Sequence, residues 1–540
     1  QLHYPVGLDA VAYRAARLCE EAHRVLSPYF ARRATQRVQV VLTDFGDSAN
    51  GSASALPYPH INLFAAPPKL DGNLNDYDDW LRLLVFHEYV HILQLDQTRG
   101  LPALINALFG GIIAPNQNLP SFTLEGGAVW LESATSARGR IHSAIFRGFL
   151  RVHALAGALY DIDAITHVPL TWPGANVWYM YGGHFIDWIA RTRGEQVMGR
   201  VHHAMADDVI PFSLNRAMLE ATGETFTALY AEWQAAQVAR AEAERDALAA
   251  EGLTPARALT TTGRRHANPR FLPDGTLWNI DTAGRVPSGI YARTPDTPVD
   301  AYDHRVLELY GTEGFDVCRD GRRVVFDRNE RYRGAYSFGD LFLYDRQSDR
   351  TTRLTNGARV REPACSVDGR WVAAAQIHAG RARLITVDLA DGAITVLHDP
   401  GGLDQMAFPV PTPDGRAVVA LRVSQTHGRD LVRVDRATGA VTPLTDDGAL
   451  ELHPHFSLDG RWLLWASDRT GVYQIHGRPW PDGEARQLTR VVGGALDPAL
   501  SPDNQRLVWS GIVPEGYDLF EAPFLPDGVG RPPPPPAPPR

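Results

Sequence analysis

Two histidines and a glutamate stand in the sequence at a spacing that suits metal chemistry. Residues 87–91 read His-Glu-Tyr-Val-His. Side chains four residues apart lie on one face of an α-helix, so His87 and His91 can both reach one metal ion. Glu88 then stands beside that ion, where it can handle a bound water. The pattern predicts a zinc-activated water that attacks a carbonyl group.

A catalytic zinc ion needs a third protein ligand and keeps its fourth position for water. Glu125 is the candidate, because it opens a helical stretch, Glu-Gly-Gly-Ala-Val-Trp, after an uncharged approach. We therefore expect one Zn²⁺ per chain, bound by His87, His91 and Glu125, with Glu88 as the general base. The alternative is that both histidines are ordinary core or surface residues beside a solvated Glu88.

The pattern of apolar residues predicts the helices and strands that carry these residues. Residues 78–97 contain the histidine pair, no proline and an apolar stripe, so they are expected to form a helix packed against a core. Three more helices are predicted at 127–148, 177–193 and 224–250, and two strands at 37–43 and 58–65.

The helix with its His-Glu-x-x-His motif, followed by the Glu125 segment, resembles the gluzincin zinc metallopeptidases over residues 35–195. That resemblance implies a mainly helical α+β domain and assigns Glu125 as the third ligand. The separation departs from familiar members: 33 residues lie between His91 and Glu125, which an inserted helical hairpin around residues 101–114 would explain. Thermolysin-like members have an Asp four positions after the glutamate, where Val129 stands here. Glu132 is either a partner of a ligating histidine or a capping or surface residue.

Two further features follow from the same resemblance. The Trp178–Phe185 segment is similar to the Tyr-x-x-Gly segment that supplies a catalytic tyrosine in the aminopeptidase branch. It implies that Tyr179 donates a hydrogen bond to the oxyanion, with Tyr181 as the second choice. The alternative is that these tyrosines are packing residues. Residues 58–64 look like the edge strand that aligns an extended substrate, and they lack the branch's Gly-x-Met-Glu-Asn motif. That absence favours an endopeptidase.

Beyond residue 253, helical periodicity gives way to short β-rich runs separated by turns. Six Asp-Gly or Asp-Asn turns recur every 44–48 residues, at 274, 320, 368, 414, 459 and 503. Such a period, with an inner strand after each turn and a closing Leu-Thr strand, predicts a six-bladed β-propeller. Residues 257–260 carry an orphan Leu-Thr strand, which we expect to complete the sixth blade; an open array of hairpins is the alternative. The repeats resemble those of TolB.

Composition limits the classes of protein. With 62 acidic and 53 basic residues, the net charge of −9 does not indicate a nucleic-acid partner. The chain has three cysteines and no Cys-x-x-Cys pair, which excludes zinc ribbons and thioredoxin chemistry. Cys318 and Cys365 fall at nearly equivalent places in adjacent blades, and the sequence does not indicate whether they are bonded. No uncharged stretch is apolar enough to span a bilayer.

We therefore expect a multidomain protein: a gluzincin-like domain at 1–253, a TolB-like propeller at 254–526 and a proline-rich tail at 527–540. The chain begins at Gln1, and we expect a bacterial protein exported to the periplasm, cell surface or medium after loss of a signal peptide. The expected activity is zinc-dependent hydrolysis of peptides or proteins, with the propeller as a substrate gate or partner-binding module. The alternatives are a non-catalytic binding protein with an unused zincin domain, or hydrolysis of another carbonyl substrate.

Overall fold

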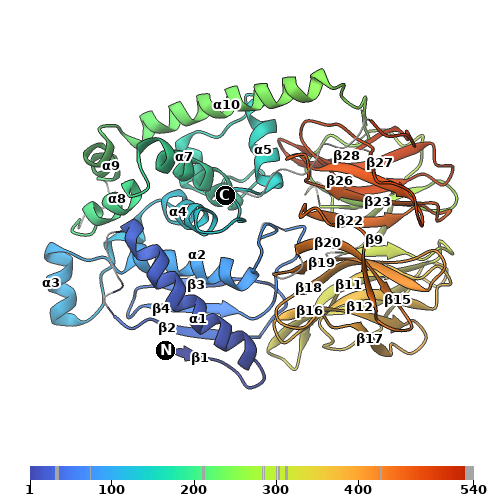
Figure 1. Cartoon of the computed structure of the whole chain (residues 1–540), viewed down its shortest axis with the longest axis horizontal. Coiled ribbons are helices and arrows are strands. Elements are labelled where there is room, and N and C mark those ends of the chain that lie inside the picture. Colours follow the sequence, from blue (N-terminus) through green and yellow to red (C-terminus); the bar gives the residue numbers. More distant parts are fainter. Residues whose placement is uncertain are drawn as a thin grey trace. The chain divides into compact units, whose positions relative to one another are not determined.

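The computed structural model describes residues 1–529 apart from residues 31–33, 35, 73, 209–212, 283, 285, 300, 302–303, 310–313 and 426–427. The chain divides into two compact units (Figure 1). One comprises Gln1–Asp44 and Ser48–Glu242, and the other comprises Phe45–Asp47 and the chain from Ala243 on. A helical N-terminal region followed by a strand-rich region confirms the multidomain architecture. The exact boundaries at 253 and 526 stay predictions, and most of the proline-rich tail lies outside the described residues.

The first unit contains a four-stranded sheet. Its strands are β1 (Leu2–His3), β2 (Gln39–Thr43), β3 (Gly51–Ser54) and β4 (His60–Phe64), in the order β1-β2-β4-β3. Strands β1, β2 and β4 are parallel, and β3 is antiparallel to β4. Both strands predicted from the sequence are therefore confirmed.

The predicted place of the edge strand is wrong. Within residues 58–64, β4 (His60–Phe64) lies inside the sheet between β2 and β3, so β3 forms the edge. Strand β3 reads Gly-Ser-Ala-Ser, without the alternation of apolar and polar residues that marks a strand. A hairpin with β4, rather than its own pattern, makes this segment a strand.

Helices account for most of the first unit. They are α1 (Asp9–Leu26), α2 (Trp80–Leu95), α3 (Gly100–Phe109), α4 (Ser121–Ala134), α5 (Ala144–Leu155), α6 (Ile162–Thr166), α7 (Gly183–Arg193), α8 (Val197–Met205), α9 (Leu214–Thr222) and α10 (Phe226–Ala250). Short turns of helix are η1 (Ser27–Phe30), η2 (Pro115–Asn118) and the π-helical turn η3 (Trp178–Gly182). The helices predicted at 78–97, 177–193 and 224–250 are present.

Two helical predictions need correction, and the sequence did not predict α1, α6, α8 and α9. The helix predicted at 127–148 is two helices, α4 and α5, joined by a loop in which Gly139 adopts φ +134°. The predicted helical hairpin around 101–114 is the single helix α3. Helix α1 is the longest of the missed helices, and its buried side chains, half of them alanines, recur on one face at helical spacing.

Helix α2 is the centre of the first unit. Asp79 caps it by accepting hydrogen bonds from the backbone N–H groups of Leu81 and Arg82. Every residue of α2 except Arg82 is buried. The helix packs against α1, α4 and the strands β3 and β4, and Figure 1 shows α1 alongside it. Polar side chains on α2 therefore lie inside the unit rather than on a solvated face.

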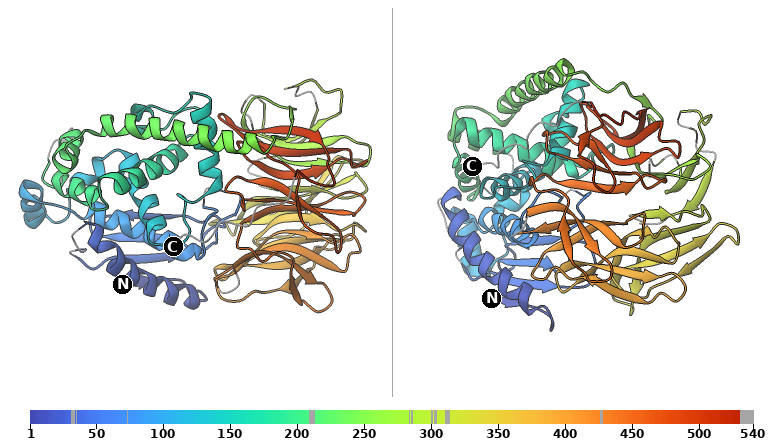
Figure 2. Two further views of the ribbon diagram at one scale, coloured as in Figure 1. Left: turned by 45° about the horizontal axis from the view of Figure 1, so that its top comes forward. Right: turned by 45° about the vertical axis from the view of Figure 1, so that its right-hand side comes forward.

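The second unit is built from six four-stranded antiparallel blades (Figure 2). The first has β6 (Arg264–Phe271), β7 (Leu277–Asp281), β8 (Gly289–Arg293) and β9 (Arg305–Glu308), and the second has β10 (Phe315–Val317), β11 (Arg323–Tyr332), β12 (Tyr336–Asp345) and β13 (Arg350–Arg353). The third has β14 (Val360–Cys365), β15 (Trp371–His378), β16 (Arg381–Asp388) and β17 (Ile394–His398), and the fourth has β18 (Gln405–Pro411), β19 (Ala417–Ser424), β20 (Gly428–Asp435) and β21 (Val441–Pro443). The fifth has β22 (Glu451–Phe456), β23 (Trp462–Ser467), β24 (Gln474–Pro479) and β25 (Arg486–Gln487), and the sixth begins with β26 (Ala495–Leu500), β27 (Arg506–Val513) and β28 (Gly516–Pro523).

The fourth strand of the last blade comes from the start of the propeller. Strand β5 (Arg257–Ala258) pairs antiparallel with β28. Strand β28 also pairs with β6, so the last blade, in red, lies against the first (Figure 2). Phe271 and Leu277 of the first blade share a core with Val508 and Leu519 of the last. The predicted closure is confirmed, and the open array is wrong.

The threonine of the Leu-Thr ending makes the same contacts in more than one blade. The Thr355 hydroxyl donates to Asp340 over 2.7 Å and accepts from the backbone N–H of Leu341. Thr260 does the same with Asp518 and Leu519. Each buried hydroxyl thus satisfies a polar side chain and a backbone group of the neighbouring strand. This shared role explains why the dipeptide recurs.

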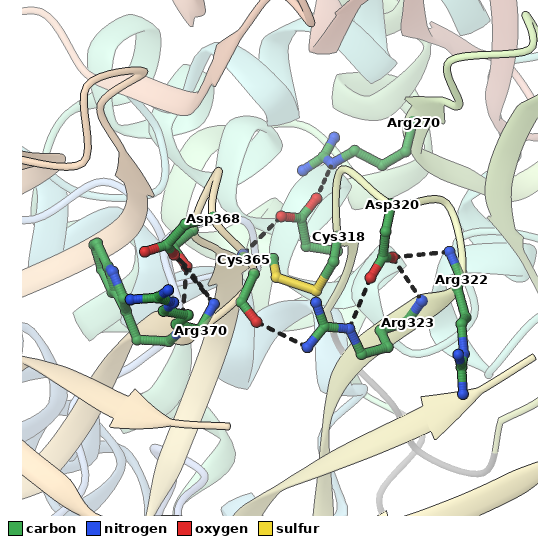
Figure 3. Close-up of a disulfide and its surroundings, with 12 residues drawn as sticks. Arg270, Cys318, Asp320, Arg322, Arg323, Cys365, Asp368 and Arg370 are labelled. Carbon is green, nitrogen blue, oxygen red and sulfur yellow. Dashed lines mark hydrogen bonds and ion pairs between the residues drawn. A yellow bond between two sulfur atoms is a disulfide. The ribbon is translucent and has the colours of Figure 1, made fainter. Parts of the chain in front are cut away.

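A disulfide joins the second and third blades, a point that the sequence left open (Figure 3). It links Cys318, just after β10, to Cys365 in β14. Beside it, the backbone N–H of Cys365 donates to Asp316, and Asp316 pairs with Arg270 of the first blade. The bond therefore lies in a set of contacts that ties three consecutive blades together.

Among the described residues, none of the helices has both the length and the apolar composition that a membrane-spanning helix needs.

Removing the disulfide should destabilise the propeller, because the bond closes a loop with a sequence separation of 47 residues. We expect the Cys318→Ser/Cys365→Ser variant to lose about 2–4 kcal/mol of unfolding free energy in guanidinium titrations. Dithiothreitol should cause the same loss in the parent protein and none in the variant. Cys19→Ser should be neutral. Three titratable thiols in the oxidised protein would contradict the bond.

Candidate metal centre

Two turns of α2 and the start of α4 bring the three predicted ligands together. The donor atoms of His87, His91 and Glu125 all lie within 4.8 Å of one another. Glu125 Oε2 is 3.2 Å from Nε2 of His87 and 3.4 Å from Nε2 of His91. Two imidazole nitrogens and one carboxylate oxygen form a donor set that suits zinc. Within the described part of the chain, this is the one such cluster.

Burial and opposite charge set the electrostatics of this cluster. Burial lowers the pKa of His91, but the Glu125 carboxylate outweighs it and raises that pKa to about 9. Burial raises the pKa of Glu125, yet the two imidazoles hold it far below its usual range. The Glu125 carboxylate is therefore ionised and faces both rings.

The second nitrogen of each histidine has its own partner. Nδ1 of His87 lies 3.0 Å from Oε2 of Glu132, whose side chain is fully buried. Nδ1 of His91 lies 2.9 Å from Oε1 of Gln94, and the Gln94 amide donates to the carbonyl of Leu124. These contacts leave both Nε2 atoms facing Glu125. Glu132 is thus the histidine partner that the sequence allowed.

Sequence reasoning missed Gln94, although a signal was present. Gln94 interrupts the apolar run Ile92-Leu93-Gln94-Leu95 on a helix that has no solvated face. A buried amide in such a run needs hydrogen-bond partners. Its position three residues after His91 makes that imidazole one of them.

Glu88 occupies space that the edge strand provides. Its carboxyl is buried, and burial raises its pKa. A Cβ atom at Gly51 of β3 would lie 2.6 Å from Oε1 of Glu88 and 2.7 Å from its Cγ. A larger residue at position 51 would therefore displace the Glu88 side chain, a role for Gly51 that the sequence did not reveal.

The structure separates the two candidate tyrosines. The Tyr179 ring centroid lies 6.1 Å from that of His87, and its hydroxyl has a raised pKa because of burial and the charge of Glu125. Tyr181 is completely buried, and its hydroxyl lies 2.5 Å from Nδ1 of His153 within an aromatic core. Tyr179 therefore joins the cluster, whereas Tyr181 packs elsewhere.

A close approach of two glycines brings Tyr179 to Glu125. The π-helical turn η3 crosses α4 where Gly182 meets Gly126. A Cβ at Gly126 would lie 2.4 Å from the carbonyl carbon of Gly182. The pair therefore sets the spacing between the segment that carries Glu125 and the segment that carries Tyr179.

Comparison with known proteins supports the propeller. Residues 319–513 match the family model described as PD40, the TolB beta propeller domain. This match covers less than half of the chain, and it agrees with the repeat found in the sequence. The C-terminal part of the chain is a TolB-like β-propeller.

Solved structures resemble the chain only distantly. TolB from Acinetobacter baumannii has 19% identity and a TM-score of 0.34, covering 48% of this chain and 63% of its own. An oligogalacturonate lyase from Vibrio parahaemolyticus has 13% identity and a TM-score of 0.34, covering 50% and 93%. A puromycin hydrolase has 18% identity and a TM-score of 0.34, covering 50% and 45%. This chain thus spans less than two thirds of the Acinetobacter protein, and such TM-scores say nothing about activity. No curated protein has a significantly similar sequence.

Replacing Gly126 by alanine should force α4 and η3 apart. Alanine favours a helix over glycine by about 1 kcal/mol, so helix propensity alone predicts stabilisation. The clash with the Gly182 backbone should instead lower the unfolding free energy by about 1–3 kcal/mol. Gly72→Ala is the control, since its Cβ would meet nothing closer than 3.5 Å. A Gly126→Ala protein with the parent's urea midpoint would contradict this packing.

Proposed function

We propose that this protein is a zinc-dependent peptidase that hydrolyses internal peptide bonds. One observation carries the proposal: His87, His91 and Glu125 converge within 4.8 Å, with Glu88 buried on the same helix. His87, His91 and Glu125 would hold the ion. When bound, zinc supplies Lewis acidity and lowers the pKa of its water to about 7.

The chain's own residues supply the proton transfers. Glu88 accepts a proton from the attacking water and delivers it to the leaving amine. Burial raises the pKa of Glu88, which makes it a stronger base than an exposed carboxylate. Tyr179 donates its hydroxyl proton in a hydrogen bond to the carbonyl oxygen as that oxygen gains negative charge. The raised pKa of Tyr179 keeps this hydroxyl protonated even in alkaline solution.

Strand β3 supports an extended peptide as the substrate. It is the edge of its sheet, and its Gly51 borders Glu88. A peptide can add to such an edge through backbone hydrogen bonds, which places its carbonyl groups beside the catalytic carboxylate. The strand Gly-Ser-Ala-Ser carries no carboxylate to bind a free amino terminus. This absence favours an endopeptidase over an aminopeptidase.

The propeller disulfide supports export to an oxidising compartment. Disulfides persist outside the cytosol, in the periplasm or beyond the cell, and are rare in reducing compartments. Cys318 and Cys365 are bonded in this propeller.

In the proposed enzyme, the propeller limits access of substrates or binds a protein partner, which are the two roles expected from the sequence.

Glu88→Gln tests the proposal directly. Both the parent and this variant should contain about one zinc per chain by plasma mass spectrometry, because Glu88 is not a ligand. Cleavage of fluorescein-casein should fall at least about 100-fold, because the general base is lost. His91→Ala should lose both zinc and activity. A metal-free parent, or a Glu88→Gln protein as active as the parent, would falsify the proposal.

Paired tyrosine variants test the oxyanion donor. Tyr179→Phe should lower kcat on casein by about 100–1000-fold while KM, zinc content and Tm stay unchanged. Tyr181→Phe loses its contact with His153, so it should lower stability by about 1 kcal/mol and leave kcat intact. The reverse pattern would transfer the catalytic role to Tyr181.

A further inference from the structure

We propose that Arg140 is a positioning residue that orients two parts of the site together, His87 through Glu132 and Tyr179 through its ring. The inference rests on the proposed peptidase function and adds a residue that the sequence did not single out. Arg140 lies in the loop between α4 and α5, directly after Gly139.

Arg140 and Glu132 form a buried bidentate ion pair. The exposed fraction is 4% for Arg140 and 2% for Glu132. Nε of Arg140 donates to Oε1 of Glu132 over 2.7 Å, and Nη2 donates to Oε2 over 2.7 Å. Two parallel hydrogen bonds fix both the carboxylate and the guanidinium plane. A buried ion pair contributes little net stability over apolar residues, so a purely structural role explains it poorly.

The same carboxylate reaches the predicted metal ligand. Oε2 of Glu132, held by Arg140, lies 3.0 Å from Nδ1 of His87. Nη2 of Arg140 also lies 2.7 Å from Nδ1. A guanidinium can only donate, so it bonds Nδ1 when the imidazole proton is on Nε2. With Nε2 free to bind a metal, the proton is on Nδ1, and Glu132 is the acceptor that sets the ring's orientation.

The Arg140 guanidinium also lies over the ring of Tyr179. Cζ of Arg140 lies 4.9 Å from the Tyr179 ring centroid, within cation–π range. Because Glu132 fixes the guanidinium plane, the ring packs against a surface of defined orientation. Tyr179 belongs to η3, a different segment from both α2 and α4. Arg140 therefore fixes the ring of Tyr179 relative to that of His87, which a lysine, with no plane and no fork, cannot do.

Zinc affinity tests the half of the proposal that concerns His87. We would measure zinc dissociation constants by chelator competition for the parent, Arg140→Gln, Arg140→Lys and Glu132→Gln. Each variant should bind zinc about 10–100-fold more weakly than the parent. Because Arg140 acts through Glu132, the double variant Arg140→Gln/Glu132→Gln should bind zinc no more weakly than the weaker-binding of the two single variants. Arg138→Gln is the matched control. Arg138 lies in the same loop as Arg140, and its guanidinium pairs with Asp76 and Asp78, which precede α2.

Turnover at saturating zinc tests the half that concerns Tyr179. Arg140→Gln should lower kcat on fluorescein-casein by at least about tenfold, with little change in KM, because the oxyanion donor is displaced. Adding Arg140→Gln to Tyr179→Phe should lower kcat no further. Losses that multiply, or zinc affinity and kcat equal to those of Arg138→Gln, would overturn the positioning role.

Folding and the proposed function are checked separately. Circular dichroism establishes that each variant is folded at the assay temperature. If Arg140→Gln unfolds, two other variants replace it in the assays. Arg140→Lys keeps the positive charge, and Arg140→Gln/Glu132→Gln removes both charges, so that no buried charge is left without a partner. A parent that binds no zinc or cleaves no casein overturns the peptidase proposal. A parent that does both, with Arg140 variants unchanged, overturns only the inference about Arg140.

Discussion

The first unit is constrained by polar groups buried within α2. His87, Glu88, His91 and Gln94 all stand on a helix with almost no exposed surface. Each buried polar atom costs free energy unless it has a partner, so the surrounding elements must supply partners at fixed places. Helix α4 supplies carboxylates, the loop after it supplies a guanidinium, and β3 supplies a glycine. The arrangement of the unit follows from this requirement as much as from apolar packing.

Patterns within one element were predictable from the sequence. The spacing of His87 and His91 places both on one helix face, and the recurring turns gave the number of blades. Closure also followed, because the strand at 257–260 lacked a partner while the last blade lacked a strand. In each case the informative residues are near in sequence or repeat at a regular interval.

Contacts between distant elements were not predictable in the same way. The role of Gly51 depends on Glu88, and that of Arg140 depends on Tyr179, so neither has a local signature. The edge position of β3 came from its hairpin rather than from its composition. The bond between Cys318 and Cys365 depends on how adjacent blades stack. The predicted ligand set was accessible because the gluzincin resemblance joined two separate segments, which periodicity alone could not do.

Closure by β5 has a consequence for how the chain becomes a propeller. Arg257 bonds Glu521 across a separation of 264 residues, so one strand of the sixth blade is synthesised long before the other three. During synthesis or secretion, β5 cannot pair with β28 until nearly the whole repeat array has emerged. Individual blades can gain local structure sooner, but the ring forms last, through its most non-local contact. A permuted chain that begins at a turn between two blades would place this strand next to its partner, and its ring should assemble faster.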